Sequence, residues 1–261
     1  MQKHLIVTAI LMIALASCQK EAANPTTALQ TIQSTVNNTV AADETSPTFN
    51  VVDNGDGTYT ATLQPDETNG QDVHVYMREG SPEIANQNFN GVPELDISAW
   101  TVNGAYAYLR VFLRFDDLAK ISTTAHVLKA TLYLYGLSSS IVSPQGNSTY
   151  PNSPYNFYGT NRSIMEAVAG PWDESTLTWN TQPKVKPEWG KVTIPASTSK
   201  WNYDVATDDV KAMVSRAVKY PDKNYGVRIS LAVESIYRNL VFASSESTDP
   251  TKRPKLVVTY E

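Results

Sequence analysis

The sequence is poor in the residues that build disulfide scaffolds and metal clusters. Its 261 residues include one Cys and three His, which excludes a disulfide framework, a Cys-rich zinc site and a His-cluster metalloenzyme. Charged residues make up 18% of the chain, and 21 basic against 26 acidic residues give a formal net charge of -5. Nucleic acid needs a basic protein surface, so we expect no nucleic-acid partner.

Long apolar runs are also missing, apart from one at the N-terminus. Residues 5–16 are apolar except for Thr8, a stretch too short to span a bilayer but typical of a signal-peptide core. The segment Leu15-Ala16-Ser17-Cys18 resembles the lipobox of bacterial lipoproteins. That resemblance implies removal of residues 1–17 and diacylation of Cys18, which would anchor the chain to a membrane.

The residues after the Cys bear on where such an anchor lies. Gln19 rather than Asp follows Cys18, and under the sorting rules of bacterial lipoproteins this favours the outer membrane, with the cell surface as the expected location. The alternative is an ordinary signal peptide that carries Cys18 by chance. Residues 18–47 are rich in Thr, Asn, Gln and Ala and contain no aromatic residue, so we expect a flexible linker there.

A β-rich domain is expected over residues 48–261. Two β-type runs, 49–52 and 58–63, flank the segment Asp53-Asn54-Gly55-Asp56-Gly57, which is a strong hairpin signal. The same oxygens are ligands that calcium prefers, but no Glu lies at the twelfth position of the loop, so we interpret it as a turn. The sequence requires no cofactor, and a structural calcium ion elsewhere in the domain stays open.

Alternation of apolar and polar residues predicts further half-buried antiparallel strands. They lie at 73–78, 105–115, 127–135, 227–233, 240–244 and 255–260, with Leu128 and Val233 among the side chains expected to face inward. One helix is expected where five apolar residues repeat at helical spacing, with Asp204 or Thr207 as its start; these are Val210, Met213, Val214, Ala217 and Val218. Many short strands and one short helix predict an all-β fold, an antiparallel β-sandwich of jelly-roll type.

A long motif then gives the chain a family resemblance. Residues 172–180 read Trp-Asp-Glu-Ser-Thr-Leu-Thr-Trp-Asn, after Leu-Arg-Phe-Asp at 113–116 and before Pro-Lys-Leu-Val-Val-Thr-Tyr at 254–260. Their order and spacing over residues 70–261 resemble the DNRLRE domain, which is similar to carbohydrate-binding module family 96. The resemblance implies a β-sandwich that binds glycan, often an acidic one such as alginate, without catalysis. The chain departs from the family at 243–246, where a basic residue is usual, and by an insertion at 138–160.

Two surfaces are candidates for glycan binding, because aromatic faces stack on sugars and Arg pairs with carboxylates. The first consists of the outward-facing side chains of the 105–115 strand, together with those of the 127–135 strand if both strands share a sheet. Alternatively, the N-terminal hairpin or the helix could cover this face. The second is the insertion, with Trp100, Trp189 and Trp201 as further stacking candidates. The first surface comprises Tyr106, Tyr108, Arg110, Phe112, Arg114, Tyr133 and Tyr135, and the second Tyr150, Tyr155, Phe157 and Tyr158.

Catalytic patterns are weak. Asp173 and Glu174 are adjacent, so on a strand they would point to opposite faces and make a poor acid/base pair, and no nucleophile-elbow sequence occurs. We therefore expect a surface-anchored, non-catalytic protein that binds polysaccharide and concentrates it for glycan-degrading enzymes. Two alternatives stay open: a lyase that uses Tyr with Arg, and a structural or adhesion module that binds protein.

Overall fold

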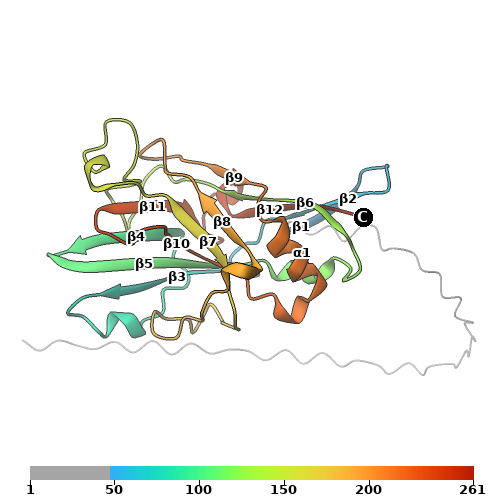
Figure 1. Cartoon of the computed structure of the whole chain (residues 1–261), viewed down its shortest axis with the longest axis horizontal. Coiled ribbons are helices and arrows are strands. Elements are labelled where there is room, and N and C mark those ends of the chain that lie inside the picture. The colour runs from blue at the N-terminus through green and yellow to red at the C-terminus, as the bar shows by residue number, and fades with distance from the viewer. Residues whose placement is uncertain (1–47) are drawn as a thin grey trace, which may run out of the picture. The chain divides into compact units, whose positions relative to one another are not determined.

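The computed structural model describes residues 48–261, which form two antiparallel β-sheets (Figure 1) that share one hydrophobic core. The predicted signal peptide, Cys18 and the linker lie outside the described residues. All strand pairs of the described residues are antiparallel, and α1 (Lys211–Lys219) is the one α-helix of this part of the chain. The predicted antiparallel β-sandwich with one short helix is therefore confirmed.

One sheet has five strands and contains the predicted hairpin. Phe49 pairs with Leu63 across it, and in the turn the carboxylates of Asp53 and Asp56 accept hydrogen bonds from the backbone N–H groups of Gly55 and Thr58. These carboxylates therefore stabilise the turn, as expected. The strands lie in the order β1 (Phe49–Asp53), β2 (Tyr59–Leu63), β12 (Lys255–Tyr260), β6 (Val127–Leu134) and β9 (Val205–Thr207).

The second sheet has seven strands, of which three were not expected from the sequence. Along β4, Leu95 and Ile97 enter the core between the sheets, while Glu94 and Asp96, which alternate with them, are buried on the other face. The strands lie in the order β11 (Arg238–Ala243), β4 (Glu94–Val102), β5 (Ala105–Arg114), β10 (Val227–Leu231), β7 (Ser163–Ala167) and β8 (Lys191–Ile194), and β3 (Gln71–Arg78) pairs with β5. The unexpected strands are β4, β7 and β8.

The helix closes one side of the main core, which lies between the two sheets. Its buried side chains are those predicted from helical spacing, including Met213 and Val218. The predicted start was wrong: the backbone at 205–207 pairs with β6 as β9, so the helix begins only at Lys211, after an N-terminal cap at Val210 without a side-chain hydrogen bond.

Two inward positions were also predicted wrongly. A register shift between Thr259 and Tyr260 places Val127 opposite Tyr260, so Val127 rather than Leu128 enters the core. Val233 lies beyond the end of β10 and is exposed. In both cases the period-two pattern was continued past the place where regular pairing stops.

The insertion folds back over β4 and β11 through a buried polar network. Ser143 Oγ lies 2.5 Å from Asp96 Oδ1 and 3.2 Å from Asn239 Oδ1. Because a hydroxyl has one proton, it cannot donate to both of these oxygens at once. Asp96 Oδ2 is buried without a partner. Burial raises the pKa of Asp96 to about 7, and a proton on this carboxyl would free the Ser143 hydroxyl to donate to Asn239.

Asp96→Asn is expected to raise stability at alkaline pH. The folded state holds a proton that the unfolded state releases near its ordinary pKa of 3.8, so wild-type stability falls as pH rises from 4 to 7. The amide keeps the neutral form at all pH values, and its Tm at pH 8 should exceed that of wild type by about 3 °C or more. Thermal unfolding from pH 4 to 8 measures this; Asp209→Asn, at an exposed carboxylate, should keep the wild-type slope. Identical slopes for Asp96→Asn and wild type would contradict it.

Candidate functional site

The predicted row on β5 does not form an open platform. Phe112 is 0% exposed, so the expectation that it is presented to a ligand is wrong. It pairs with Val73 on β3 and contacts the ring of Trp172 with centroids 5.6 Å apart. This second, smaller core lies on the sheet face opposite the main core and comprises Val73, Val75, Phe112, Val168, Trp172 and Leu177.

The two guanidinium groups of the row hold the covering segment in place. Arg110 makes a bidentate ion pair with Glu234 at 2.7 and 2.8 Å and lies 4.4 Å from the centroid of the Trp179 ring. Arg114 donates to the carbonyl oxygen of Trp172 at 2.9 Å. Residues 172–182, which we call the cover loop, therefore occupy the face that we expected either to be open or to be covered by the hairpin or the helix.

The two tyrosines of the row lie at its other end. Tyr106 is 45% exposed, whereas Tyr108 is half-buried and packs against the main core. The row is thus divided: Tyr106 is the member most accessible to a ligand, and Arg110, Phe112 and Arg114 contact the cover loop or its neighbours.

Tyr133 and Tyr135 lie on or next to β6, which belongs to the other sheet, so the two predicted rows do not share a surface. Their rings are nearly parallel, at 13°, with centroids 6.4 Å apart. Lys255 pairs with Tyr133 across β12 and β6, and its ammonium lies 4.7 Å from that ring centroid. Lys252 lies 5.6 Å from the ring of Tyr135. We call these four residues the tyrosine–lysine platform.

The sequence offered a signal for the two lysines that was not used. Lys255 opens the C-terminal strand, and pairing of that strand with 127–135 would have placed it beside a tyrosine. Lys252 could not have been found this way, because it lies in the 3₁₀ turn Pro250–Lys252. That turn is positioned by Asp249, whose carboxylate accepts from the backbone N–H of Thr251 at 3.0 Å.

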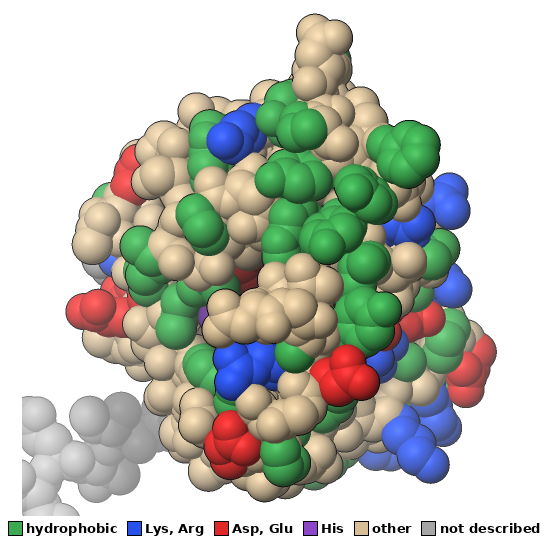
Figure 2. All heavy atoms as spheres, turned by 90° about the vertical axis from the view of Figure 1, so that its left-hand side faces the viewer, with side chains coloured by type: hydrophobic (Ala, Val, Ile, Leu, Met, Phe, Trp, Pro, Cys, Tyr) green, Lys and Arg blue, Asp and Glu red, His purple; other side chains and the backbone are tan. Residues whose placement is uncertain are grey.

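A second aromatic surface lies at the end of the sandwich that carries the insertion and the β4–β5 hairpin (Figure 2). Trp100 contacts Tyr155 of the insertion and Tyr237, with centroids 4.8 and 5.1 Å apart. Phe157, 91% exposed, and Tyr158 extend the cluster. Figure 2 shows hydrophobic side chains gathered on this end. We call Trp100, Tyr155, Phe157, Tyr158 and Tyr237 the aromatic tip.

The sequence analysis named four of these five residues: it grouped Tyr155, Phe157 and Tyr158 on the insertion and gave Trp100 as a separate stacking candidate. Tyr237 was missed; its backbone is left-handed, with a φ of 63°, which no sequence pattern indicated. Of the other stacking candidates, Trp189 packs under Arg216 with its ring centroid 3.9 Å away, and Trp201 lies near Lys200. Tyr150 is outside the ring contacts of the described residues.

A model of carbohydrate-binding module family 96 matches residues 71–260. The chain belongs to carbohydrate-binding module family 96. Membership supports carbohydrate binding and a polysaccharide partner, and it assigns the cover loop, β3, β5 and β12 to one module. A search of curated proteins finds no match to the sequence. Within residues 48–261, no helix combines the length and apolar character that crossing a membrane requires.

Arg110 is expected to stabilise the module. Arg110→Ala leaves Glu234 without its bidentate partner and removes the contact with Trp179, so the free energy of unfolding should fall by about 2 kcal/mol and the Tm by about 5 °C. Arg110→Lys keeps the charge but not the fork geometry, so its Tm should lie between those of wild type and Arg110→Ala. Tyr106→Ala, at an exposed position of the same strand, should change the Tm little. An unchanged Tm with weakened glycan binding in Arg110→Ala would instead place Arg110 at a ligand.

Proposed function

We propose that the module binds an acidic polysaccharide, without catalysis, on the tyrosine–lysine platform. The observation that carries the proposal is the pair of nearly parallel tyrosine rings with two ammonium groups beside them. Aromatic faces pack against the apolar faces of sugar rings, and ammonium groups attract uronate carboxylates. The platform thus combines the two features that an acidic glycan needs in one place.

The polar groups of the platform are available for such contacts. Within residues 48–261, the hydroxyl groups of Tyr133 and Tyr135 make no hydrogen bond, and Lys255 makes no ion pair. Lys252 lies 3.4 Å from Asp204, a contact that is exposed to solvent and therefore weak. A carboxylate of the glycan can replace it at small cost.

The aromatic tip is less suited to an acidic chain. The guanidinium of Arg238, the residue after Tyr237, donates to the carbonyl oxygens of Val233 and Tyr158 at 3.0 and 2.9 Å, so it supports the loops beneath the rings. The tip offers mainly apolar ring area, which fits a neutral glycan or another protein. We therefore assign the acidic glycan to the platform.

A capture role follows from the location of the platform on the outer face of a sheet. Lyase chemistry needs a base beside a neutralised carboxylate in a site that excludes water, whereas this face is open. A single exposed site binds weakly, so capture would work by raising the concentration of polysaccharide near partner enzymes at the cell surface.

The platform is tested by affinity electrophoresis of the chain from residue 18 onward with Cys18→Ser. Alginate and pectin gels should retard the protein and a neutral β-glucan gel should not, and retardation should weaken as salt rises. Lys255→Gln and Tyr133→Ala should each weaken binding by about fivefold to tenfold. Trp100→Ala, at the aromatic tip, is the matched control and should keep wild-type retardation.

Other outcomes would contradict the proposal in different ways. Loss of retardation in Trp100→Ala alone would move binding to the aromatic tip. No retardation in any gel would favour the adhesion module. New unsaturated chain ends in the polymer would mean that the protein is a lyase.

We also propose that Cys18 carries the lipid that anchors the module to the outer membrane, since the segment before it resembles a lipobox. Full-length chain expressed in a Gram-negative host should incorporate labelled palmitate and fractionate with outer membranes. Cys18→Ser should lose the label and accumulate with its signal peptide uncleaved. A labelled Cys18→Ser protein, or an unlabelled wild type, would contradict lipidation at this residue.

A further inference from the structure

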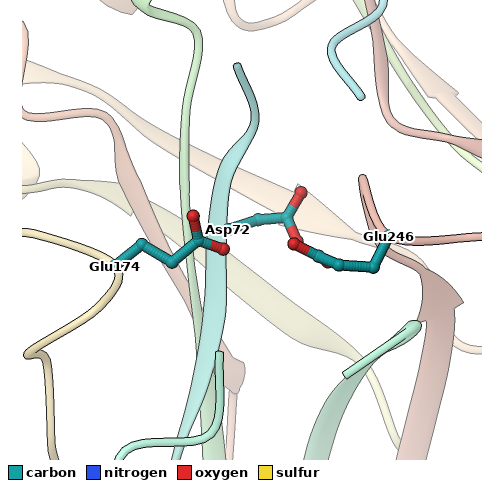
Figure 3. Close-up of side chains that lie close together, drawn as sticks. All are labelled: Asp72, Glu174 and Glu246. Atoms are coloured by element: carbon teal, nitrogen blue, oxygen red, sulfur yellow. The ribbon is translucent and has the colours of Figure 1, made fainter. Parts of the chain in front are cut away.

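Three carboxylates from distant parts of the sequence converge beside the start of β3 (Figure 3). Asp72 is the second residue of β3, Glu174 belongs to the cover loop, and Glu246 lies in the turn that follows β11. One oxygen of each lies within 4.8 Å of the other two. Glu174 is part of the long family motif, but its partners could not be named from the sequence.

Each carboxylate is held in place and still has a free oxygen. Asp72 Oδ2 accepts from the backbone N–H of Ser245 at 3.0 Å, and Glu246 Oε1 accepts from the Ser245 hydroxyl at 3.3 Å. Glu174 accepts from the backbone N–H of Asp72. The remaining oxygens are buried and have no hydrogen-bond partner among the described residues; they are Asp72 Oδ1, Glu174 Oε1 and Glu246 Oε2.

This arrangement is unfavourable without a cation. Asp72 is 1% exposed, and an unpaired buried carboxylate is strongly destabilising. None of the ion pairs of the described residues involves these three groups. Burial, with the neighbouring charge of Glu246, raises the pKa of Asp72 well above its usual range and that of Glu174 to about 7.

We propose that Asp72, Glu174 and Glu246 bind a calcium ion. All donors are oxygens, which calcium prefers over nitrogen and sulfur. Ligands at the usual 2.3–2.6 Å from calcium lie at most about 5 Å apart, which fits the observed spacing. The site opens to a pocket lined by Glu67, Asn90 and Thr248 together with Glu174 and Glu246. That pocket gives water and further oxygen ligands access to the ion.

The ion would fasten the cover loop to the sandwich. It would join β3, the cover loop and the turn after β11, which otherwise repel one another through their charges. Packing at this point is already tight, because a Cβ on Gly70 would come within 2.1 Å of the Ser245 hydroxyl oxygen. Glu174 lies two residues from Trp172, so the same ion would stabilise the second core.

Thermal unfolding with and without calcium tests the site on the chain from residue 18 onward with Cys18→Ser, after chelator treatment. Calcium at 1 mM should raise the Tm by about 5 °C or more, and titration calorimetry should give one site per chain. Glu174→Gln and Glu246→Gln should keep the β-sheet circular dichroism spectrum but lose the calcium-dependent rise. Glu188→Gln, at an exposed carboxylate, should keep it.

Three results would overturn the proposal. Absence of any calcium effect, with a rise in Tm from pH 8 to 6 that is smaller in Glu174→Gln than in wild type, would mean that the carboxylates share protons instead. An equal Tm rise with magnesium would contradict the assignment to calcium. A calcium effect unchanged in both Gln variants would place the ion elsewhere. Glycan retardation is measured separately, so this inference and the proposed function can fail independently.

Discussion

The packing of Trp172 on Phe112 is the interaction on which the rest of the arrangement depends. Trp172 contacts the Phe112 ring, donates its indole N–H to the carbonyl oxygen of Tyr225 at 2.7 Å, and accepts from Arg114 through its own carbonyl. One residue thus joins β5, the cover loop and the segment before β10. Trp172 also buries apolar side chains on the face of the seven-stranded sheet that lies opposite the main core.

Burial of that sheet on both faces limits where a ligand can bind. The cover loop lies over β3 and β5, and the insertion contacts β4 and β11 through Asp96 and Asn239. Within residues 48–261, no comparable segment covers β6 and β12, where Lys255 and Tyr133 pair on the outer face. The open surfaces are therefore the platform and the end of the sandwich, although the aromatic row on β5 was the more prominent sequence signal.

The sequence predicted what depends on local periodicity and missed what depends on distant contacts. The hairpin, β5, β6, β10, β12 and the buried face of α1 follow from alternation or helical spacing. The alternation of side chains along β5 shows which residues share a face. It cannot show that the main core covers one face and the cover loop covers the other. Arg110 reads as a solvent-exposed cation until its partner Glu234, 124 residues away, is known. The carboxylate cluster could not be predicted from the sequence for the same reason, since its three members are distant in the sequence and come together only in the folded structure.

The segment between Glu246 and Lys255 links the two proposed sites physically. Glu246 belongs to the carboxylate cluster, and Lys252 and Lys255 belong to the platform. Between them, Arg253 Nε donates to the carbonyl oxygen of Ser247 at 3.1 Å, and its own carbonyl accepts from Gln64 at 3.0 Å. The connection is thus short and is hydrogen-bonded to Gln64, the residue after β2 of the five-stranded sheet. A cation that fixes Glu246 would therefore restrain the backbone that carries both lysines, which lowers the entropy lost when the platform binds a charged chain.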